Sequence, residues 1–322
     1  MESKKVKYPT KEREHWHHLL DSSIWNEFKY RDDDIVINAY SKSGTTWVQQ
    51  IVAQLIWNGA GNINVAELSP WLDCRFPSKE ERLEVVEAQT HRRFIKSHLP
   101  VDTLMFSPKA KYIYIGRDGR DVLWSLYNHH RNFKKEVIQS IDSVPERTGP
   151  PLGDAPSSVI EYFRDWLTKD GYPWWPYWSH ILSWWRIKDM PNVMLQHFSN
   201  LKRDMPCEIR RMAAFLDITI DEKMWDSILE HCSFEYMKAH AAQSVPFGGR
   251  LFEGGAETFM HKGTNGRWKD MLTPEDVERY EQTAREKLGA DCAYWLSTGA
   301  FQQMEIAQGN IIEFKSDEDR AR

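Results

Sequence analysis

The chain has 322 residues, with 42 Lys and Arg against 47 Asp and Glu, so its formal net charge is −5. Its 17 Gly and 15 Pro are an ordinary content that excludes collagen-like and low-complexity chains, and its acidic balance argues against a nucleic-acid-binding protein. The 15 Trp, 12 Tyr and 14 Phe supply a large apolar side-chain surface, and the chain is long enough to bury a sizeable core.

The first sixty residues alternate between strand, loop and helix. Residues 34–40 are β-branched and apolar, as expected of a buried strand. After a loop at 41–46, apolar residues recur at helical spacing from Trp47 to Ile56, which predicts a helix that ends at Asn58 and Gly59.

The remainder of the chain repeats this alternation. Strands are predicted at residues 93–96, 111–116 and 193–198, and helices near residues 122–133, 206–216, 221–231 and 273–288. Strands that alternate with helices indicate an α/β fold with a central parallel sheet flanked by helices. No shift in composition marks a boundary, so we expect a single domain over residues 1–322.

Three stretches do not fit the alternation. Residues 142–158 are rich in Pro, Gly and Ser, which is typical of a surface loop. Residues 171–180 place three Trp and two Tyr beside two Pro, and we interpret them as a rigid aromatic surface segment rather than a regular helix. The polar residues 316–322 are expected to fray.

The loop between the first strand and the first helix has the composition of an anion site. Unpaired N–H groups and the positive end of the helix dipole favour a bound anion there. Gly44 lets the backbone approach a phosphate, Thr45 and Thr46 add hydroxyl groups, and Lys42 adds a charge. A simple helix cap is the alternative, and a Walker loop is excluded because Lys42 precedes the Gly.

Two further segments are cationic. Arg117 follows a predicted strand, and Ser125 lies about two turns into the next helix, so both could contact a phosphate. Arg–Asp pairs on a solvated face are the alternative for this segment. Residues 261–269 form a cationic, Gly-containing loop that in isolation could be an ordinary surface turn.

Together the three segments resemble the motifs of cytosolic-type sulfotransferases, which use 3′-phosphoadenosine 5′-phosphosulfate (PAPS). The first motif reads KSGTTW from Lys42, after Ser41 where the family has Pro. The later motifs match at Arg117, Asp121, Ser125, Lys262, Gly263, Gly266, Trp268, Lys269 and Thr273. The matches run in family order from residue 35 to residue 273, and the chain is most similar to bacterial members, including glycolipid and aryl sulfotransferases. The resemblance implies a P-loop-like nucleotide-binding sulfotransferase fold.

The resemblance also implies catalytic roles. His98, in the segment Lys96-Ser97-His98-Leu99-Pro100, matches the general base that takes the proton of the acceptor hydroxyl. Lys42 and Lys96 would offset negative charge that develops during in-line transfer. PAPS would leave as adenosine 3′,5′-bisphosphate, and no metal is implied.

Residues that would bind the nucleotide follow in the same way. They are Lys42, Ser43, Gly44, Thr45, Thr46, Trp47, Arg117, Ser125, Phe198, Cys232, Phe234, Met237, His261, Lys262 and Gly263. Trp47 matches the position that stacks on adenine. Phe198 and Cys232 stand where the family commonly has Tyr and Thr, and His261 replaces an Arg that grips the 3′-phosphate. Because His is neutral about half the time near its pKa, we expect weaker or pH-dependent PAPS binding.

The acceptor is expected to be a small, largely hydrophobic phenol, alcohol, sterol or glycolipid, sulfated on a hydroxyl or an amine. Residues 142–180 would lie on the acceptor side, where Trp174, Trp175 and Trp178 would form either an aromatic lid or a rigid packed loop. His129 is a further candidate for this side. The family's dimer motif matches at Lys269, Thr273 and Glu278, but Pro274 replaces Val, which argues against that homodimer.

The remaining features indicate a soluble protein. Four scattered Cys without a CxxC pair favour free thiols, and the charged N-terminal residues lack the apolar core of a signal peptide. No apolar run approaches the length of a membrane span. We therefore expect a cytoplasmic enzyme without membrane insertion. A P-loop-type nucleotide kinase and an inactive adenine-nucleotide-binding module are the alternative functions.

Overall fold

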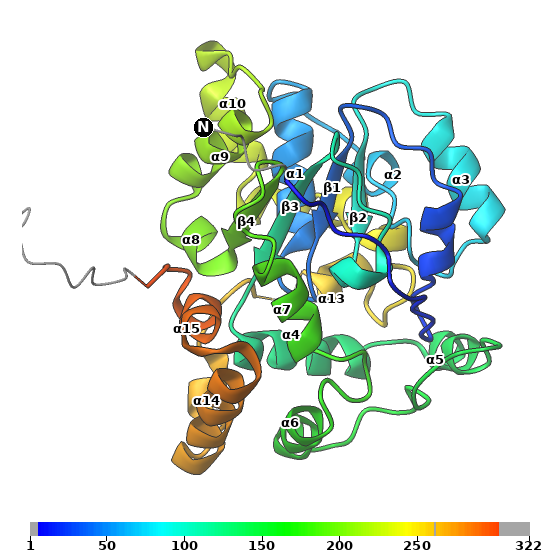
Figure 1. The fold of residues 1–322 in the computed structure, drawn as a ribbon, viewed down its shortest axis with the longest axis vertical. Helices are drawn as coiled ribbons and strands as arrows, with labels where there is room; N and C mark the ends of the chain where they lie inside the picture. The colour runs from blue at the N-terminus through cyan, green and yellow to red at the C-terminus, as the bar shows by residue number, and fades with distance from the viewer. Residues whose placement is uncertain (1–5, 261, 303–322) are drawn as a thin grey trace, which may run out of the picture.

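A four-stranded parallel sheet forms the centre of the computed structural model, which describes residues 6–260 and 262–302 (Figure 1). The strand order is β2-β1-β3-β4, and Ile37 of β1 is in register with Lys96 and Ile113. The strands are β1 (Ile35–Asn38), β2 (Phe94–Ser97), β3 (Lys111–Gly116) and β4 (Val193–His197). The predicted α/β class, the parallel sheet and the strand positions are confirmed.

Helices surround the sheet and form most of the regular secondary structure of the described residues. The α-helices are α1 (Thr45–Ile56), α2 (Val65–Leu68), α3 (Lys79–Glu87), α4 (Gly119–Arg131), α5 (Lys135–Asp142), α6 (Val159–Thr168), α7 (Trp178–Trp185), α8 (Phe198–Arg203), α9 (Met205–Phe215), α10 (Trp225–His231), α11 (Phe234–Ala239), α12 (Ala241–Ser244), α13 (Gly255–Phe259), α14 (Pro274–Leu288) and α15 (Ala290–Thr298). The 3₁₀-helices are η1 (Ser22–Asn26), η2 (Val101–Thr103), η3 (Glu222–Met224), η4 (Pro246–Gly249) and η5 (Arg267–Asp270).

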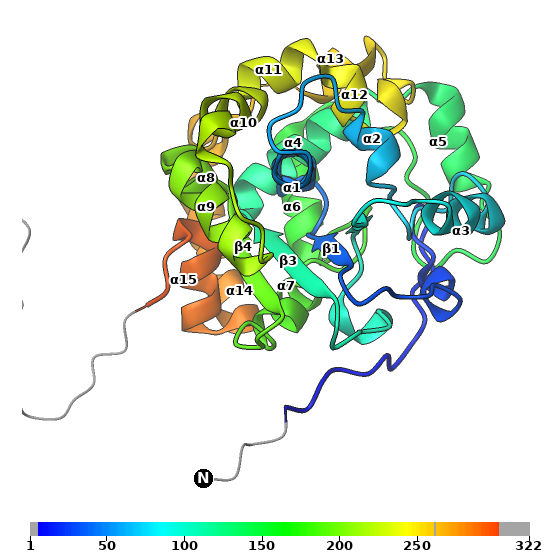
Figure 2. The ribbon, with the colours of Figure 1, turned by 90° about the horizontal axis from the view of Figure 1, so that it is seen from above.

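Side chains alternate between the two faces of the sheet, and both faces are buried. Ile37 and Ile113 pack in a cluster with residues of α1, α9 and α10. Val36 and Tyr114 pack on the opposite face with residues of α4, α6, α7 and α15. Figure 2 shows α1, α9 and α10 on one side of the strands and α7 and α14 on the other. Burial on both faces explains why the strands read as nearly continuous apolar runs.

Several helix ends differ from the sequence prediction for local reasons. Helix α4 begins at Gly119, three residues earlier than expected, because the side chain of Asp118 accepts a hydrogen bond from the N–H of Arg120 and caps the helix. The helix expected at 221–231 is divided into η3 and α10. Thr273 caps α14 as predicted, and Pro274 lies in its first turn, where the helix needs no N–H from it.

The aromatic segment at 171–180 was predicted wrongly as a surface segment without regular helix. Trp174, Trp175 and Trp178 are 4, 1 and 3% exposed, and Trp178 begins α7. The indole rings pack against the face of the sheet that α7 covers, and the hydroxyl of Tyr40 donates to the carbonyl of Trp175 at 2.7 Å. Tertiary burial therefore overrides the local Pro-rich composition.

The loop predicted at 142–158 is confirmed as irregular from Ser143 to Ser158, after α5 ends at Asp142. No helix within residues 6–260 and 262–302 is long and apolar enough to cross a membrane. The tail at 316–322 and His261 lie outside the described residues. The single-domain organisation stays a prediction.

Three buried His lie close together near the start of the chain. The rings of His17 and His18 are 3.7 Å apart, and His15 stacks on His17 at 6.1 Å. Both ring nitrogens of His18 lack a hydrogen-bond partner among the described residues. Burial lowers the pKa of His15 to about 4 and that of His17 to about 3, and it holds the pKa of His18 well below its usual value. These rings are therefore neutral in the folded protein.

We expect acid to destabilise the fold through this cluster. The unfolded chain binds protons below about pH 6.5, whereas the folded chain excludes them, so the free energy of unfolding falls by about 1.4 kcal/mol per pH unit for each excluded proton. Urea unfolding measured from neutral pH to about pH 4.5 checks this. His18→Leu should flatten the pH dependence by about one such contribution. A free energy of unfolding that is constant over this range would contradict the expectation.

Candidate active site

One cavity of about 480 Å³ lies beyond the carboxyl ends of the strands. The loops that follow β1, β2 and β3 meet there because the carboxyl ends of parallel strands share one edge of the sheet. One part of the cavity is polar and includes Lys42, Arg117 and Lys262. The other part is aromatic and includes Phe133, Phe252, Phe259 and Trp174. The cavity can therefore hold an anionic group beside an apolar one.

The β1–α1 loop curls around the N-terminus of α1. Lys42 and Gly44 both have positive φ, at 68° and 119°. The N–H groups of Trp47 and Val48 donate to the carbonyl of Gly44, whereas those of Thr45 and Thr46 belong to the turn that has no acceptor within the helix. The hydroxyl-bearing Thr45 and Thr46 line the cavity. This arrangement suits a bound anion, as the sequence predicts.

We expect Gly44→Ala to destabilise the fold and distort this loop. A Cβ at Gly44 would lie 2.9 Å from Cδ2 of Phe198 and 3.0 Å from Cδ1 of Ile115, on a backbone that already disfavours a side chain. Strain and overpacking together should lower the free energy of unfolding by about 2 to 4 kcal/mol in urea unfolding. Gly255→Ala is the control, because φ there is also positive but a Cβ meets nothing within 4 Å. Equal losses in the two variants would contradict the role of the close contacts.

Arg117 connects two segments that are far apart in sequence. Its guanidinium donates to Oδ1 of Asn265 at 3.1 Å and to the carbonyl oxygens of Thr264 at 3.0 Å and Lys42 at 3.2 Å. It also lies over the ring of Phe198 at 4.2 Å. Because the residue is 8% exposed, these contacts fix the guanidinium at the polar part of the cavity.

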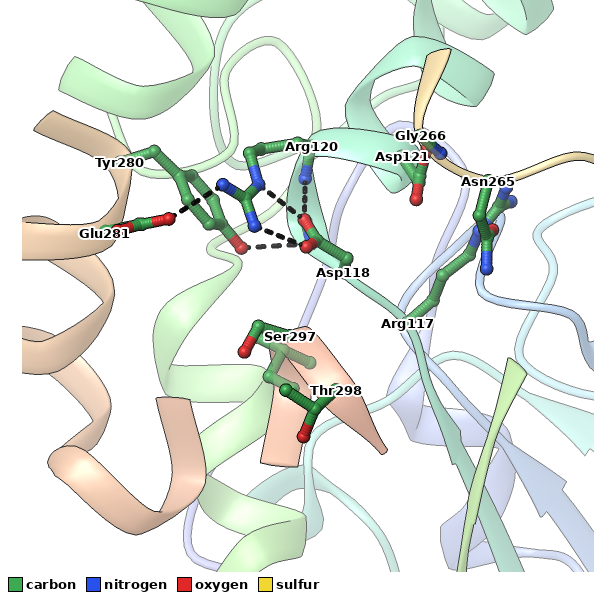
Figure 3. A network of polar contacts seen from close by, with 12 residues as sticks. Arg117, Asp118, Arg120, Asp121, Asn265, Gly266, Tyr280, Glu281, Ser297 and Thr298 are labelled. Carbon is green, nitrogen blue, oxygen red and sulfur yellow. Dashed lines mark hydrogen bonds and ion pairs between the residues drawn. The ribbon is translucent and has the colours of Figure 1, made fainter. Parts of the chain in front are cut away.

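Arg120 differs from Arg117 in the residues that it contacts. In Figure 3 its guanidinium points toward Asp118 and Glu281, whereas that of Arg117 points toward Asn265. The bond from Arg120 to Oδ2 of Asp118 is 2.7 Å long, and the ring of Trp268 stacks on its guanidinium at 3.8 Å. Arg120 therefore joins the start of α4 to η5 and α14 and lies outside the cavity lining.

His98 follows β2 and is held by one contact of its ring and one of its backbone. Its ring Nδ1 lies 2.6 Å from the carbonyl oxygen of Ala39, and its backbone N–H donates to Oδ2 of Asp73 at 2.9 Å. Because a carbonyl only accepts, Nδ1 carries the proton and Nε2 keeps a lone pair. Burial, followed by the charge of Lys96, holds the pKa of His98 well below its usual value. The imidazole is therefore a neutral base at the cavity.

Two lysines flank His98 at the cavity. Burial lowers the pKa of Lys96 to about 8, and its ammonium lies 4.6 Å from the ring centre of Trp71. Burial and the charge of Lys96 also hold the pKa of Lys42 well below its usual value. A bound anion would favour the charged form of both amines, so the site gains positive charge when an anion enters.

Most of the predicted site residues line this cavity. They are Lys42, Gly44, Thr45, Thr46, Trp47, Lys96, His98, Arg117, Ser125, Phe198, Phe234, Met237, Lys262 and Gly263, together with His129. Ser43 and Cys232 do not line it: Ser43 is 1% exposed, and the buried Cys232 accepts a hydrogen bond from Nε1 of Trp47 through its carbonyl at 2.9 Å. Cys232 therefore orients Trp47. The roles of all these residues stay predictions.

Sequence reasoning missed several residues that shape the site. Asp73 holds the backbone of His98, and Asn265 and Thr264 hold Arg117. Phe252 and Phe259 complete the aromatic part of the cavity. No motif marks these residues, because an isolated Asp or Phe in a loop gives no signal of its partner. Within the described part of the chain, no group of three His, Cys, Asp or Glu side chains could hold a metal ion.

Comparisons with known proteins identify one family. The family model described as "Sulfotransferase domain" matches residues 32–291. A glycolipid sulfotransferase of Mycobacterium tuberculosis is 30% identical over 305 residues, which cover 87% of this chain and 93% of that protein. Sulfotransferase 1B1 of Mus musculus is 29% identical over 274 residues, covering 81% and 85%.

Solved structures share the fold. Mouse sulfotransferase SULT7A1 complexed with PAP superposes with a TM-score of 0.68 at 23% identity, covering 85% of this chain and 92% of that one. Retinol dehydratase in a complex with retinol and PAP has a TM-score of 0.63 at 23% identity, covering 83% and 84%. The expected fold class is therefore confirmed.

Proposed function

The chain belongs to the sulfotransferase family, and from that premise we propose that it moves the sulfuryl group of PAPS to a hydroxyl of a small, largely hydrophobic acceptor, with His98 as general base. The observation that carries this proposal is the position of His98, whose unprotonated Nε2 belongs to a ring that lines a cavity with one cationic and one aromatic part. A nucleotide kinase has no comparable support.

The residues of the polar part fit an adenosine phosphosulfate. The N-terminus of α1, Lys42 and Arg117 offer hydrogen-bond donors and positive charge to phosphate oxygens. Gly44 keeps the loop free of a Cβ that would meet Phe198. The ring of Trp47, fixed through the carbonyl of Cys232, would stack on the adenine. PAPS supplies the sulfuryl group when it is bound, and the chain supplies position and charge.

His98 would act on the acceptor hydroxyl. Its Nε2 takes the proton as the oxygen attacks sulfur in line with the leaving phosphate, which contributes a factor of about 10² to 10⁴ in rate. Lys42 and Lys96 stabilise the negative charge that develops on the transferring and bridging oxygens. Neither step calls for a metal, so we expect EDTA to leave transfer unchanged.

The aromatic part of the cavity supports a hydrophobic acceptor. Phe133, Phe252, Phe259 and Trp174 present apolar surface to the cavity that His98 also lines. The relatives named above include a glycolipid sulfotransferase and a structure that holds retinol. A glycolipid and retinol both have a large apolar part. A phenol, alcohol, sterol or glycolipid is therefore the proposed acceptor class, with an amine as the variant nucleophile. The cytoplasmic location stays a prediction, and so does the argument from Pro274 against the family's homodimer.

We expect the paired variants Trp174→Leu and Trp175→Leu to separate acceptor binding from folding. Trp174 lines the cavity, so its loss should raise the acceptor KM about fivefold or more, whereas Trp175 is buried beside Tyr40 and its loss should mainly lower the free energy of unfolding by about 3 kcal/mol. Steady-state kinetics and urea unfolding measure both. An unchanged KM for Trp174→Leu would remove Trp174 from the acceptor wall.

A transfer assay tests the proposed function. The purified chain is incubated with [³⁵S]PAPS and a panel of phenols, alcohols, sterols and glycolipids, with and without EDTA. Labelled product that forms in EDTA supports sulfuryl transfer. Tight binding of adenosine 3′,5′-bisphosphate with no product from any acceptor would instead support the inactive nucleotide-binding module.

A further inference from the structure

A second imidazole, His129 of α4, lines the same cavity as His98 but has a different hydrogen-bond partner. Its Nδ1 lies 3.3 Å from Nζ of Lys42, whereas Nδ1 of His98 faces the carbonyl of Ala39. When a bound anion keeps Lys42 charged, its ammonium group can only donate a hydrogen bond, so Nδ1 of His129 accepts and the proton of the neutral ring lies on Nε2. The two imidazoles of the cavity are then opposite tautomers.

Aromatic rings pack against the His129 ring. Phe133, Phe252 and Phe259 lie 4.8, 4.5 and 5.4 Å from it between ring centres. Within residues 6–260 and 262–302, Lys42 is the one hydrogen-bond partner of this ring. The ring is partly accessible, and its Nε2 is not among the buried atoms that lack a partner. Nε2 is therefore open to the cavity.

Lys42 connects His129 with the β1–α1 loop at residues 39–44, which we call the anion loop. Its backbone lies in that loop, and its Nζ lies over the ring of Phe259 at 3.6 Å from the centroid. Burial is the largest cause that keeps the pKa of His129 well below its usual value, and the charge of Lys42 adds to it. A neutral His129 accepts a hydrogen bond from Lys42, so it holds the ammonium in one place within apolar surroundings.

We propose that His129 positions Lys42 through Nδ1 and donates a hydrogen bond from Nε2–H to a second oxygen of the acceptor molecule. This inference rests on the proposed sulfuryl transfer and specifies its substrate class. The acceptor would carry its reacting hydroxyl toward His98 and a further ether, carbonyl or hydroxyl oxygen toward His129. In an otherwise aromatic part of the cavity, that oxygen is the feature that separates preferred acceptors from plain hydrocarbon alcohols.

The tautomers can be measured without any acceptor, with adenosine 3′,5′-bisphosphate bound so that an anion favours the charged form of Lys42. Two-bond ¹H–¹⁵N correlation spectra of protein labelled at His nitrogens distinguish the two neutral forms and the charged form, and His98→Asn and His129→Asn assign the signals. We expect His98 protonated on Nδ1 and His129 protonated on Nε2 near neutral pH. An Nδ1-protonated or charged His129 would overturn the proposal.

A substrate scan tests the donor role. In a series of 4-alkylphenols, one methylene after another is replaced by an ether oxygen. The wild type should favour one oxygen position about 5- to 10-fold in KM, the range of a single hydrogen bond, and His129→Phe should lose this preference while His129→Gln retains part of it. A preference that survives in His129→Phe, or none in the wild type, refutes the donor role. Failure of the wild type to transfer to any acceptor rejects the proposed function instead, and the spectra still decide the tautomers.

Discussion

His98→Asn should lower kcat by a factor of about 10² to 10⁴, the usual contribution of a positioned base. The Asn side chain places an N–H group where Nδ1 of His98 lies, so it can keep the bond to the carbonyl of Ala39 while the basic Nε2 is lost. Initial rates with [³⁵S]PAPS measure the loss. Calorimetry with adenosine 3′,5′-bisphosphate should find an unchanged Kd, because His98 is not among the proposed nucleotide contacts.

The pH dependence gives a second measure of the same role. A base must be neutral, and the pKa of His98 lies well below its usual value because the ring is buried. On the acid side, the wild-type kcat should therefore stay constant from neutral pH down to about pH 6.5 and fall only as the pH drops through that lowered pKa. His98→Asn should lack this acid limb.

A control variant excludes a general effect of removing an imidazole. His240 lies on the short turn between α11 and α12, outside the cavity lining, with its Nδ1 2.9 Å from the carbonyl of Tyr236. His240→Asn should keep kcat. If His98→Asn retains kcat within about tenfold of the wild type, His98 is not the base.

Arg117→Lys should weaken binding of adenosine 3′,5′-bisphosphate by about 30- to 1000-fold, the effect of about 2 to 4 kcal/mol lost with a buried, charged hydrogen-bonding group. The guanidinium reaches Asn265, Thr264 and the carbonyl of Lys42 at once. A single ammonium cannot reach all three acceptors and a phosphate, so the 264–265 loop loses its attachment to the anion loop. Calorimetric titration measures the change in Kd.

The matched control makes the same Arg-to-Lys substitution at a position outside the cavity. Arg210 of α9 forms an exposed ion pair with Glu222 of η3, and neither residue lines the cavity. Arg210→Lys should leave the Kd unchanged. An unchanged Kd for Arg117→Lys would contradict both a contact of Arg117 with the nucleotide and a contribution of its loop contacts to binding.

The sequence by itself determines the framework and the polar part of the site. The short apolar runs at β1, β2, β3 and β4 predict strands because strands that are buried on both faces consist of such runs. Lys42, Gly44 and Arg117 follow directly from their strands, so their place at the carboxyl edge of the sheet depends on short-range connectivity alone.

Only the tertiary structure decides what meets across the cavity. The bonds between Lys42 and His129, between His98 and Ala39, and between Trp47 and Cys232 join residues 59 to 185 positions apart. The segment at 171–180 reads as exposed in sequence and is buried in the fold, because its rings fill the face of the sheet beside α7. Local composition indicates neither which distant residue a side chain will contact nor whether that side chain will be buried, because both depend on how distant segments pack. For that reason the anion loop and the candidate His129 could be predicted from sequence, whereas the contact of His129 with Lys42 and the resulting tautomer could not.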